Sequence, residues 1–152
     1  MKDLSAIDLI SILLSVSAVA FSVVTYIKNI RHDRKKDTLD AYNRLQAEVF
    51  DKLNTYTPLQ IREIAMDNKS ADYKTVSGYL ARIEHFCVGL NQGIYDKKTF
   101  YALAHGYFDK YQLRKRIEPM LKSKNSSKNT SELFYNDTLS VLKWMDKKAG
   151  KT

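Results

Sequence analysis

The stretch DLISILLSVSAVAFSVVTYIKNIRHDRKK, residues 8–36, decides the architecture of this 152-residue chain. From Leu9 to Ile27 it holds 19 residues without a formal charge. At about 1.5 Å per residue, such a helix nearly matches the roughly 30 Å hydrocarbon core of a bilayer. The stretch therefore predicts a membrane-spanning helix. A cleaved signal peptide is the alternative, because Ala18-Val19-Ala20 resembles a cleavage site, but the start MKDLSAID is not clearly positive and the apolar run continues.

The charges on either side of the span predict its orientation. Five basic residues follow it closely: Lys28, Arg31, Arg34, Lys35 and Lys36. The first eight residues hold one lysine and two aspartates. Because basic flanks stay on the cytoplasmic side, we expect the N-terminus outside and the C-terminal part in the cytosol. We expect the five basic side chains at the headgroup level, where anionic lipids attract them.

A polar seam runs along the expected span. Its residues alternate three and four places apart, which puts them on one side of a helix. They are Asp8, Ser11, Ser15, Ala18, Ser22, Thr25 and Asn29, with His32 continuing the series. Three interpretations stay open: close packing of helices in a homo-oligomer, a water-lined pore, or a lone anchor whose serines bond to their own backbone. In a pore, Asp8 would lie at the outer mouth and Lys28, Arg31 or His32 at the inner one.

The rest of the chain is expected to be helical. It has 5 glycines and 2 prolines in total, and runs of alternating polar and β-branched residues are missing. The predicted fold is all-α, with one N-terminal transmembrane helix continuing into a cytosolic bundle of about four to five helices. We expect the transmembrane helix over 1–30, a juxtamembrane helix over 31–56 and the bundle over 57–150.

Local signals predict where the bundle helices begin and end. Thr57 and Pro58 begin one helix as part of a capping box, and Ser70 begins a longer one that Gly93 ends. Asp96 is expected to cap the next helix, which Pro119 ends or kinks. A polar loop is expected over 123–131, and a last helix over 132–147. Apolar residues at helical spacing predict two inward stripes, one from Leu39 to Tyr56 and one from Tyr73 to Ile94.

The sequence offers little that catalysis could use. His85 and Cys87 lie two places apart on an expected helix, so they point to different sides, and Cys87 fits the apolar stripe. His105 fits a structural role beside the aromatic residues near it. There is no phosphate-binding glycine loop, no HExxH motif and no paired metal-ligand spacing. We therefore expect no catalytic residue, no metal and no cofactor.

A second basic group follows the aromatic residues Tyr107 and Tyr111. Its members are Lys110, Arg114, Lys115 and Arg116, extended by Lys122, Lys124 and Lys128. With a net charge of +8, the chain suits an anionic partner. RNA could use phosphate contacts and stacking there. A solvated helix face is the competing interpretation.

Residues 79–121 resemble the central region of an uncharacterised bacterial family of single-pass membrane proteins. The shared pattern is Tyr-Leu-x3-Glu-x4-Gly-x3-Gly-x2-Asp with a later proline, here Tyr79, Leu80, Glu84, Gly89, Gly93, Asp96 and Pro119. The layout is also similar to the membrane accessory proteins of type VI-B CRISPR systems. That resemblance implies a ring-shaped pore in the bacterial inner membrane, a HEPN-related domain and an RNA-guided nuclease as partner. The HEPN signature Arg-x4-His is absent, so RNA cleavage is not expected.

The leading hypothesis is a non-enzymatic inner-membrane protein that assembles through the seam into a pore and depolarises the membrane in antiviral defence. The alternative is a membrane-tethered helical module that recruits RNA or a protein through the second basic group.

Overall fold

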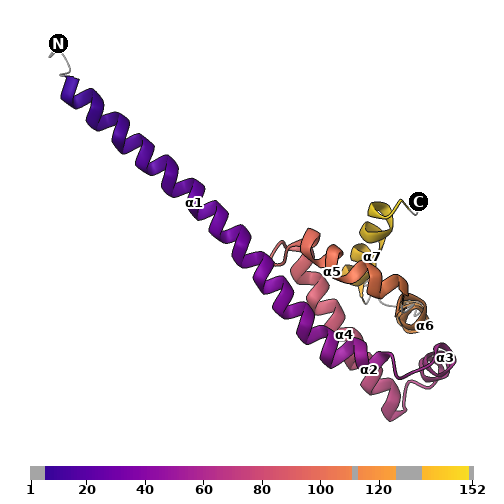
Figure 1. Ribbon diagram of the computed structural model, residues 1–152. Coiled ribbons are helices and arrows are strands. Elements are labelled where there is room, and N and C mark those ends of the chain that lie inside the picture. Colours follow the sequence, from indigo (N-terminus) through magenta and orange to yellow (C-terminus); the bar gives the residue numbers. More distant parts are fainter. Residues whose placement is uncertain (1–5, 111–112, 126–134, 151–152) are drawn as a thin grey trace. The chain divides into compact units, whose positions relative to one another are not determined.

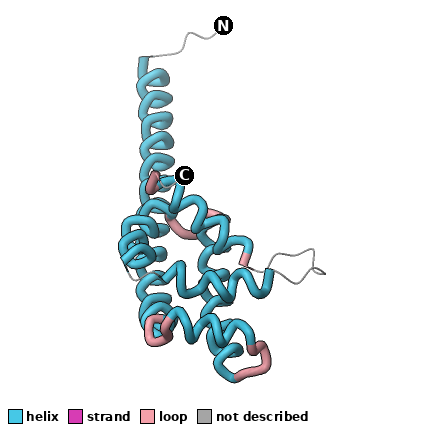
Figure 2. The backbone as a smooth tube through the Cα atoms, turned by 90° about the vertical axis from the view of Figure 1, so that its right-hand side faces the viewer, coloured by secondary structure: helices cyan, strands magenta, loops and turns pink. Residues whose placement is uncertain are grey.

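The computed structural model describes residues 6–110, 113–125 and 135–150, and all regular structure in these ranges is helical (Figure 1; Figure 2). The chain divides into two compact units, Met1–Arg34 and Lys35–Thr152. A long apolar helix opens the chain and a helical domain follows. The predicted all-α fold is therefore confirmed.

The N-terminal unit consists of the first part of helix α1, Ala6–Leu45. Its apolar side chains are largely exposed, with Leu13 at 61% and Phe21 at 74%. This helix is long and apolar enough to cross a membrane. An exposed apolar surface of this size is typical of segments that contact a membrane or another protein.

The helical run continues past α1 without a break, through the π-helix η1, Gln46–Phe50, and the short α2, Asp51–Leu53. The stripe predicted here is buried at Tyr42, Leu45, Val49 and Leu53. The π-turn adds one residue to the local repeat, so Phe50 is buried beside Val49. These residues belong to the core of the second unit. The boundary expected at residue 57 stays a prediction.

The prediction of burial is wrong at one position of the first stripe. Leu39 is 41% exposed, and its neighbour Thr38 is fully buried instead. The Thr38 hydroxyl accepts a hydrogen bond from the backbone N–H of Asp96 at 2.7 Å. A buried threonine is stable here because its hydroxyl is hydrogen-bonded.

The caps of the next two helices are confirmed. In α3, Pro58–Met66, the Thr57 hydroxyl accepts from the Gln60 N–H at 3.2 Å, and the Thr57 N–H donates to the Gln60 side chain at 2.8 Å. In α4, Ala71–Asn91, the Ser70 hydroxyl accepts from the Tyr73 N–H at 3.0 Å. Each cap satisfies backbone donors that a helix start leaves unpaired.

Gly93 ends α4 as predicted, in a left-handed conformation with φ of 75°. The Ile94 N–H donates to the Gly89 carbonyl at 2.9 Å, and the Gly93 N–H to the Leu90 carbonyl at 3.3 Å, which is a Schellman motif. The Tyr95 ring covers Gly89 so closely that a Cβ there would lie 2.6 Å from the ring. Ile94, expected in the inward stripe, lies beyond the helix end and is 56% exposed.

Three helices complete the described part: α5, Lys97–Lys110; α6, Leu113–Asn125; and α7, Asn136–Lys148. The predicted cap of α5 is confirmed, because the Thr99 N–H donates to the Asp96 carboxylate at 2.7 Å. The prediction that Pro119 ends a helix is wrong, since Pro119 lies inside α6, whereas the kink predicted as the alternative stays a prediction.

Burial of the α6 side chains on both sides of Pro119 explains why the helix continues through it. Ile117 and Met120 are fully buried. Their packing outweighs the backbone hydrogen bond that proline cannot form.

The loop expected over 123–131 is wrong at 123–125, which belong to α6, and its remainder lies outside the described residues. The last helix, expected from 132, begins as α7 at Asn136, because Tyr135 before it is in a left-handed conformation.

The second unit packs its helices in pairs. Helix α3 lies against α6, and α4 lies against α7, while α5 contacts α6 and η1 contacts α4. Aromatic rings fill the centre, where Phe100 lies near Tyr42 and Phe86 with ring centroids 6.2 and 5.4 Å away. Such rings supply a large share of the apolar area that a small domain buries.

Candidate functional site

The seam residues lie along α1 and are exposed within the single chain. Their alternate spacing puts them on one side of the helix, and apolar residues such as Leu13 and Val24 occupy most of the remaining surface, with Ser17 as a polar exception. The N-terminal unit therefore carries two kinds of surface, one able to bond with water or polar groups and one suited to lipid.

Two seam serines bond to their own helix. The Ser15 hydroxyl donates to the Ser11 carbonyl at 2.9 Å, and the Ser22 hydroxyl donates to the Ala18 carbonyl at 2.8 Å. Such bonds to the residue four places earlier use the single hydroxyl proton and leave both oxygen lone pairs as acceptors. A serine held in this way can lie in hydrocarbon and can still accept a hydrogen bond from water or from a neighbouring helix.

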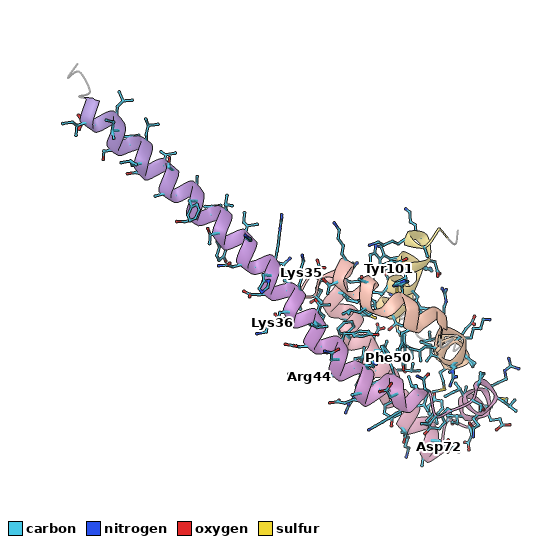
Figure 3. The ribbon with its side chains drawn as sticks, in the orientation of Figure 1. Lys35, Lys36, Arg44, Phe50, Asp72 and Tyr101 are labelled. Carbon is cyan, nitrogen blue, oxygen red and sulfur yellow. The ribbon has the colours of Figure 1, made fainter. Side chains whose placement is uncertain are left out.

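The five flanking basic residues are all exposed, as a headgroup-level position requires. Lys28, Arg31 and Arg34 belong to the first unit, and Lys35 and Lys36 to the second. Figure 3 labels Lys35 and Lys36 on α1. Their expected contact with anionic lipid stays a prediction.

The second basic group is only partly available to a partner. Arg114 forms an ion pair with Asp146 at 2.5 Å. Arg116 is half-buried and donates to the carbonyls of Asn54 and Tyr56 at 2.9 and 2.7 Å. Lys115 is exposed between them. The structure therefore brings two of the predicted RNA-binding residues into contacts that hold the fold.

The remaining members of that group cannot be placed. The side chains of Lys110, Lys122 and Lys124 lie outside the described part of the structure, as do Tyr111 and Lys128. Tyr107 is described, and its hydroxyl donates to Asp51 at 3.1 Å and accepts from the Asn54 amide. Burial, followed by its contact with Asp51, raises the pKa of Tyr107 to about 12.

A cluster of rings and lysines forms a site that the sequence did not reveal. Trp144 of α7 and Tyr101 of α5 meet edge to face with ring centroids 5.8 Å apart. The ammonium of Lys148 lies 4.6 Å from the Tyr101 ring centre and 5.3 Å from that of Trp144. The ammonium of Lys97 lies 5.9 Å from the Trp144 ring centre. These cation–π contacts join residues from distant parts of the sequence.

The sulfur and imidazole groups take the positions expected of structural residues. Cys87 is buried, and burial raises the pKa of its thiol to about 12, so little reactive thiolate forms at neutral pH. His85 is exposed on another side of α4. His105 stacks on Tyr101, and its Nδ1 lies 3.0 Å from the Tyr101 carbonyl oxygen.

An open pocket of about 470 Å³ lies between α3 and the start of α4. Its lining is Tyr56, Gln60, Glu63, Ile64, Asp67, Ser70 and Asp72. Three carboxylates there disfavour phosphate groups. The acidic pocket thus lies in a different region of the second unit from Lys35, and Figure 3 shows Asp72 far from that residue.

The family model described as "Domain of unknown function (DUF4760)" matches residues 9–144. The chain belongs to this family. The match includes both the apolar span and nearly all of the helical domain, so the family unites the two units. No curated protein and no solved structure matches the chain. The likeness to type VI-B accessory proteins and to HEPN domains stays a prediction.

Proposed function

We propose that this protein is a non-enzymatic membrane protein that self-associates through the seam of α1 and forms a pore. The supporting observation is the seam itself, which keeps Ser11, Ser15, Ser22 and Thr25 on one side of the helix, with Ser17 the one hydroxyl of serine or threonine between Leu9 and Ile27 outside it. A lone anchor has no need to gather its hydroxyls. Helices that meet around an axis do, because polar groups in a membrane are stable where they face protein or water.

The back-bonded serines, which a lone anchor would also show, fit a pore as well. The Ser15 and Ser22 hydroxyls donate to the Ser11 and Ala18 carbonyls of the same helix, so the hydroxyl oxygens remain acceptors for water along the axis. A ring of uncharged hydroxyls would conduct ions with weak selectivity. Asp8 would add negative charge at the outer mouth, while Lys28 and Arg31 would line the inner one.

The proposed topology is a single pass in the bacterial inner membrane, with the N-terminus outside and the helical domain in the cytosol. The flanking charges support it. The proposed context is antiviral defence beside an RNA-guided nuclease, which the shared layout with type VI-B accessory proteins supports. A pore is preferred over a tether for RNA because Arg114 and Arg116 are engaged within the domain.

The mass of the purified full-length protein in detergent tests self-association. We expect a closed oligomer of defined size. A monomeric mass across a range of detergents would contradict the proposal. Multi-angle light scattering that subtracts the detergent contribution gives this mass directly.

Leakage from vesicles tests the pore. We expect full-length protein to release potassium, and the double variant Ser15→Leu/Ser22→Leu to abolish release. The matched control is Val16→Leu/Val23→Leu, which has the same spacing but lies about 100° around the helix. The control should leak like the wild type. Equal leakage from the serine variant would rule out a pore lined by the seam.

A further inference from the structure

We propose that the second unit carries a binding surface for anionic phospholipid headgroups, formed by Lys35, Lys97, Lys98 and Lys148 around Trp144 and Ile94. We call this the lysine surface. It extends the contact with lipid from the flank of the span to the folded domain. The inference rests on the membrane anchoring in the proposed function and is independent of oligomer or pore formation.

Two sets of contacts bring the lysines together from three helices. Lys97 of α5 and Lys148 of α7 both lie on the Trp144 ring, at 5.9 and 5.3 Å from its centre. Lys35 of α1 and Lys98 of α5 both lie close enough to Asp96 to lower the pKa of its carboxyl. Lys97 and Lys98 are adjacent in the first turn of α5, so that turn takes part in both sets.

Asp96 does not neutralise the lysine surface. Its carboxylate accepts hydrogen bonds from both the N–H and the hydroxyl of Thr99, at 2.7 Å each, and so serves as the cap of α5. The Asp96 N–H is fixed by Thr38. Asp96 thus sets one negative charge against those of Lys35 and Lys98, while Lys97 and Lys148 add two positive charges at Trp144, which makes this part of the domain suited to phosphate.

The turn after α4 exposes an apolar side chain, Ile94, three residues before Lys97 in the sequence. In most Schellman motifs the residue after the glycine packs on the last helical turn. Here that place is Gly89, which the Tyr95 ring covers. Ile94 is therefore displaced outward and stays 56% exposed, two residues from Asp96. An exposed isoleucine and a half-exposed tryptophan ringed by lysines resemble the composition of surfaces that bind a membrane interface.

The short connection between the apolar span and Lys35 keeps the lysine surface near the bilayer. Lys35 follows Ile27, the last residue of the apolar run, by eight residues, and even a fully extended chain of that length spans only about 28 Å. This limit applies whatever the arrangement of the two units. Tethering raises the effective concentration of headgroups, so a weak site is well occupied. This favours lipid over a freely diffusing anion such as RNA.

Trp144 is the only tryptophan, so its fluorescence reports on the lysine surface without a label. The experiment uses full-length protein reconstituted in vesicles of phosphatidylcholine alone or mixed with phosphatidylglycerol. Acrylamide, a neutral quencher in the water, should quench Trp144 less in the anionic vesicles. Added salt should remove that difference. Equal quenching in the two lipid mixtures would overturn the proposal.

The variant Lys97→Gln/Lys98→Gln/Lys148→Gln should lose the lipid-dependent difference. The matched control is Lys52→Gln/Lys69→Gln/Lys74→Gln, which removes the same charge from exposed lysines elsewhere in the domain and should keep the difference. Each variant is compared with itself across lipids, so a direct effect on Trp144 cancels. A difference that survives in the first variant would contradict the assignment.

Two further measurements distinguish this inference from the proposed function and from binding of RNA. Resistance to extraction by alkaline carbonate reports anchoring alone, so a failure of the proposed function is seen independently. A single-stranded oligoribonucleotide added to neutral vesicles tests the other anionic partner. If RNA protects Trp144 and phosphatidylglycerol does not, the lysine surface binds nucleic acid and the lipid assignment is wrong.

Discussion

The carboxylate of Glu84 on α4 holds the start of α7 through Thr138, accepting from its backbone N–H at 2.8 Å and from its hydroxyl at 2.6 Å. The same carboxylate accepts from the Asp137 N–H at 3.0 Å. These bonds satisfy the first donors of α7, whose N-cap residue, Tyr135, offers no side-chain cap. Glu84, 53 positions before Asp137, thus caps α7 in place of a residue next to the helix.

Glu84→Gln should lower the free energy of unfolding of the full chain by about 1–3 kcal/mol. The amide replaces one acceptor oxygen with a donor, which then faces a backbone N–H. Denaturant unfolding in detergent, followed by circular dichroism, measures the change. The control Glu63→Gln removes an exposed charge and should change stability by less than about 0.5 kcal/mol. Equal effects of the two variants would show that Glu84 does not cap α7.

Two glycines of α4 should respond to alanine with opposite signs. Gly89→Ala would place a Cβ 2.6 Å from the Tyr95 ring, which stacks on Phe86 with centroids 4.9 Å apart. The ring must shift, so we expect a loss of about 1–3 kcal/mol. Gly78 has open space around its missing Cβ, so Gly78→Ala should stabilise the helix by about 0.5–1 kcal/mol. The same unfolding measurement compares them, and a Gly89→Ala variant as stable as wild type would contradict the packing.

Arg116 should matter for stability and Lys115 should not. The guanidinium of Arg116 donates to two carbonyls that follow α2, those of Asn54 and Tyr56. Arg116→Ala should cost about 1.5–3 kcal/mol, since hydrogen bonds from charged donors are strong. Lys115→Ala, the exposed neighbour, serves as the control and should be nearly neutral. If Lys115→Ala destabilised the protein and Arg116→Ala did not, the stabilising role assigned to Arg116 would be contradicted.

Acid should weaken the cap of α5. Burial raises the pKa of Asp96, but hydrogen bonds from Thr99 and the charges of Lys35 and Lys98 outweigh it, so the pKa lies below 3.8. The carboxylate therefore stabilises the folded state above pH 3.8, and this contribution is lost as the pH falls through the lowered pKa. Asp96→Asn keeps a cap without the titration, so its stability should depend less on pH across this window. Parallel acid unfolding curves for the two proteins would refute the prediction.

The sequence predicted the helix caps, helix ends and buried helix faces that depend on residues close together in the chain. The caps at Thr57, Ser70 and Asp96 and the turn at Gly93 could be predicted because each depends on residues only a few positions apart in the chain. The inward stripe of α4 followed from the helical period, until the Schellman turn moved Ile94 out of it. Pro119 was misjudged because packing on both sides of it, which outweighs the lost hydrogen bond, is a tertiary effect.

The parts that sequence reasoning missed all depend on how helices dock. Arg116 meets carbonyls 60 and 62 residues earlier, and nothing local distinguishes it from Lys115. Trp144 and Lys97 are 47 residues apart, and their contact exists only because the start of α5 and the end of α7 converge. The seam was predictable because three- and four-residue spacing fixes a helix face, whereas the assembly of that face with other copies stays a prediction.

Reaction of single cysteines with a charged, water-soluble thiol reagent tests the central proposal most directly. Cysteines are placed one at a time at the seam positions Ser11, Ser15, Ala18, Ser22 and Thr25, and at Leu13, Val16 and Val24, which the proposal turns toward lipid, in full-length protein in vesicles. The native Cys87 can stay, because it is buried and its pKa is raised to about 12. A pore around the seam predicts rapid modification at the five seam positions and none at the other three. Protection of the seam positions, or equal reaction on both faces, would contradict a water-lined axis.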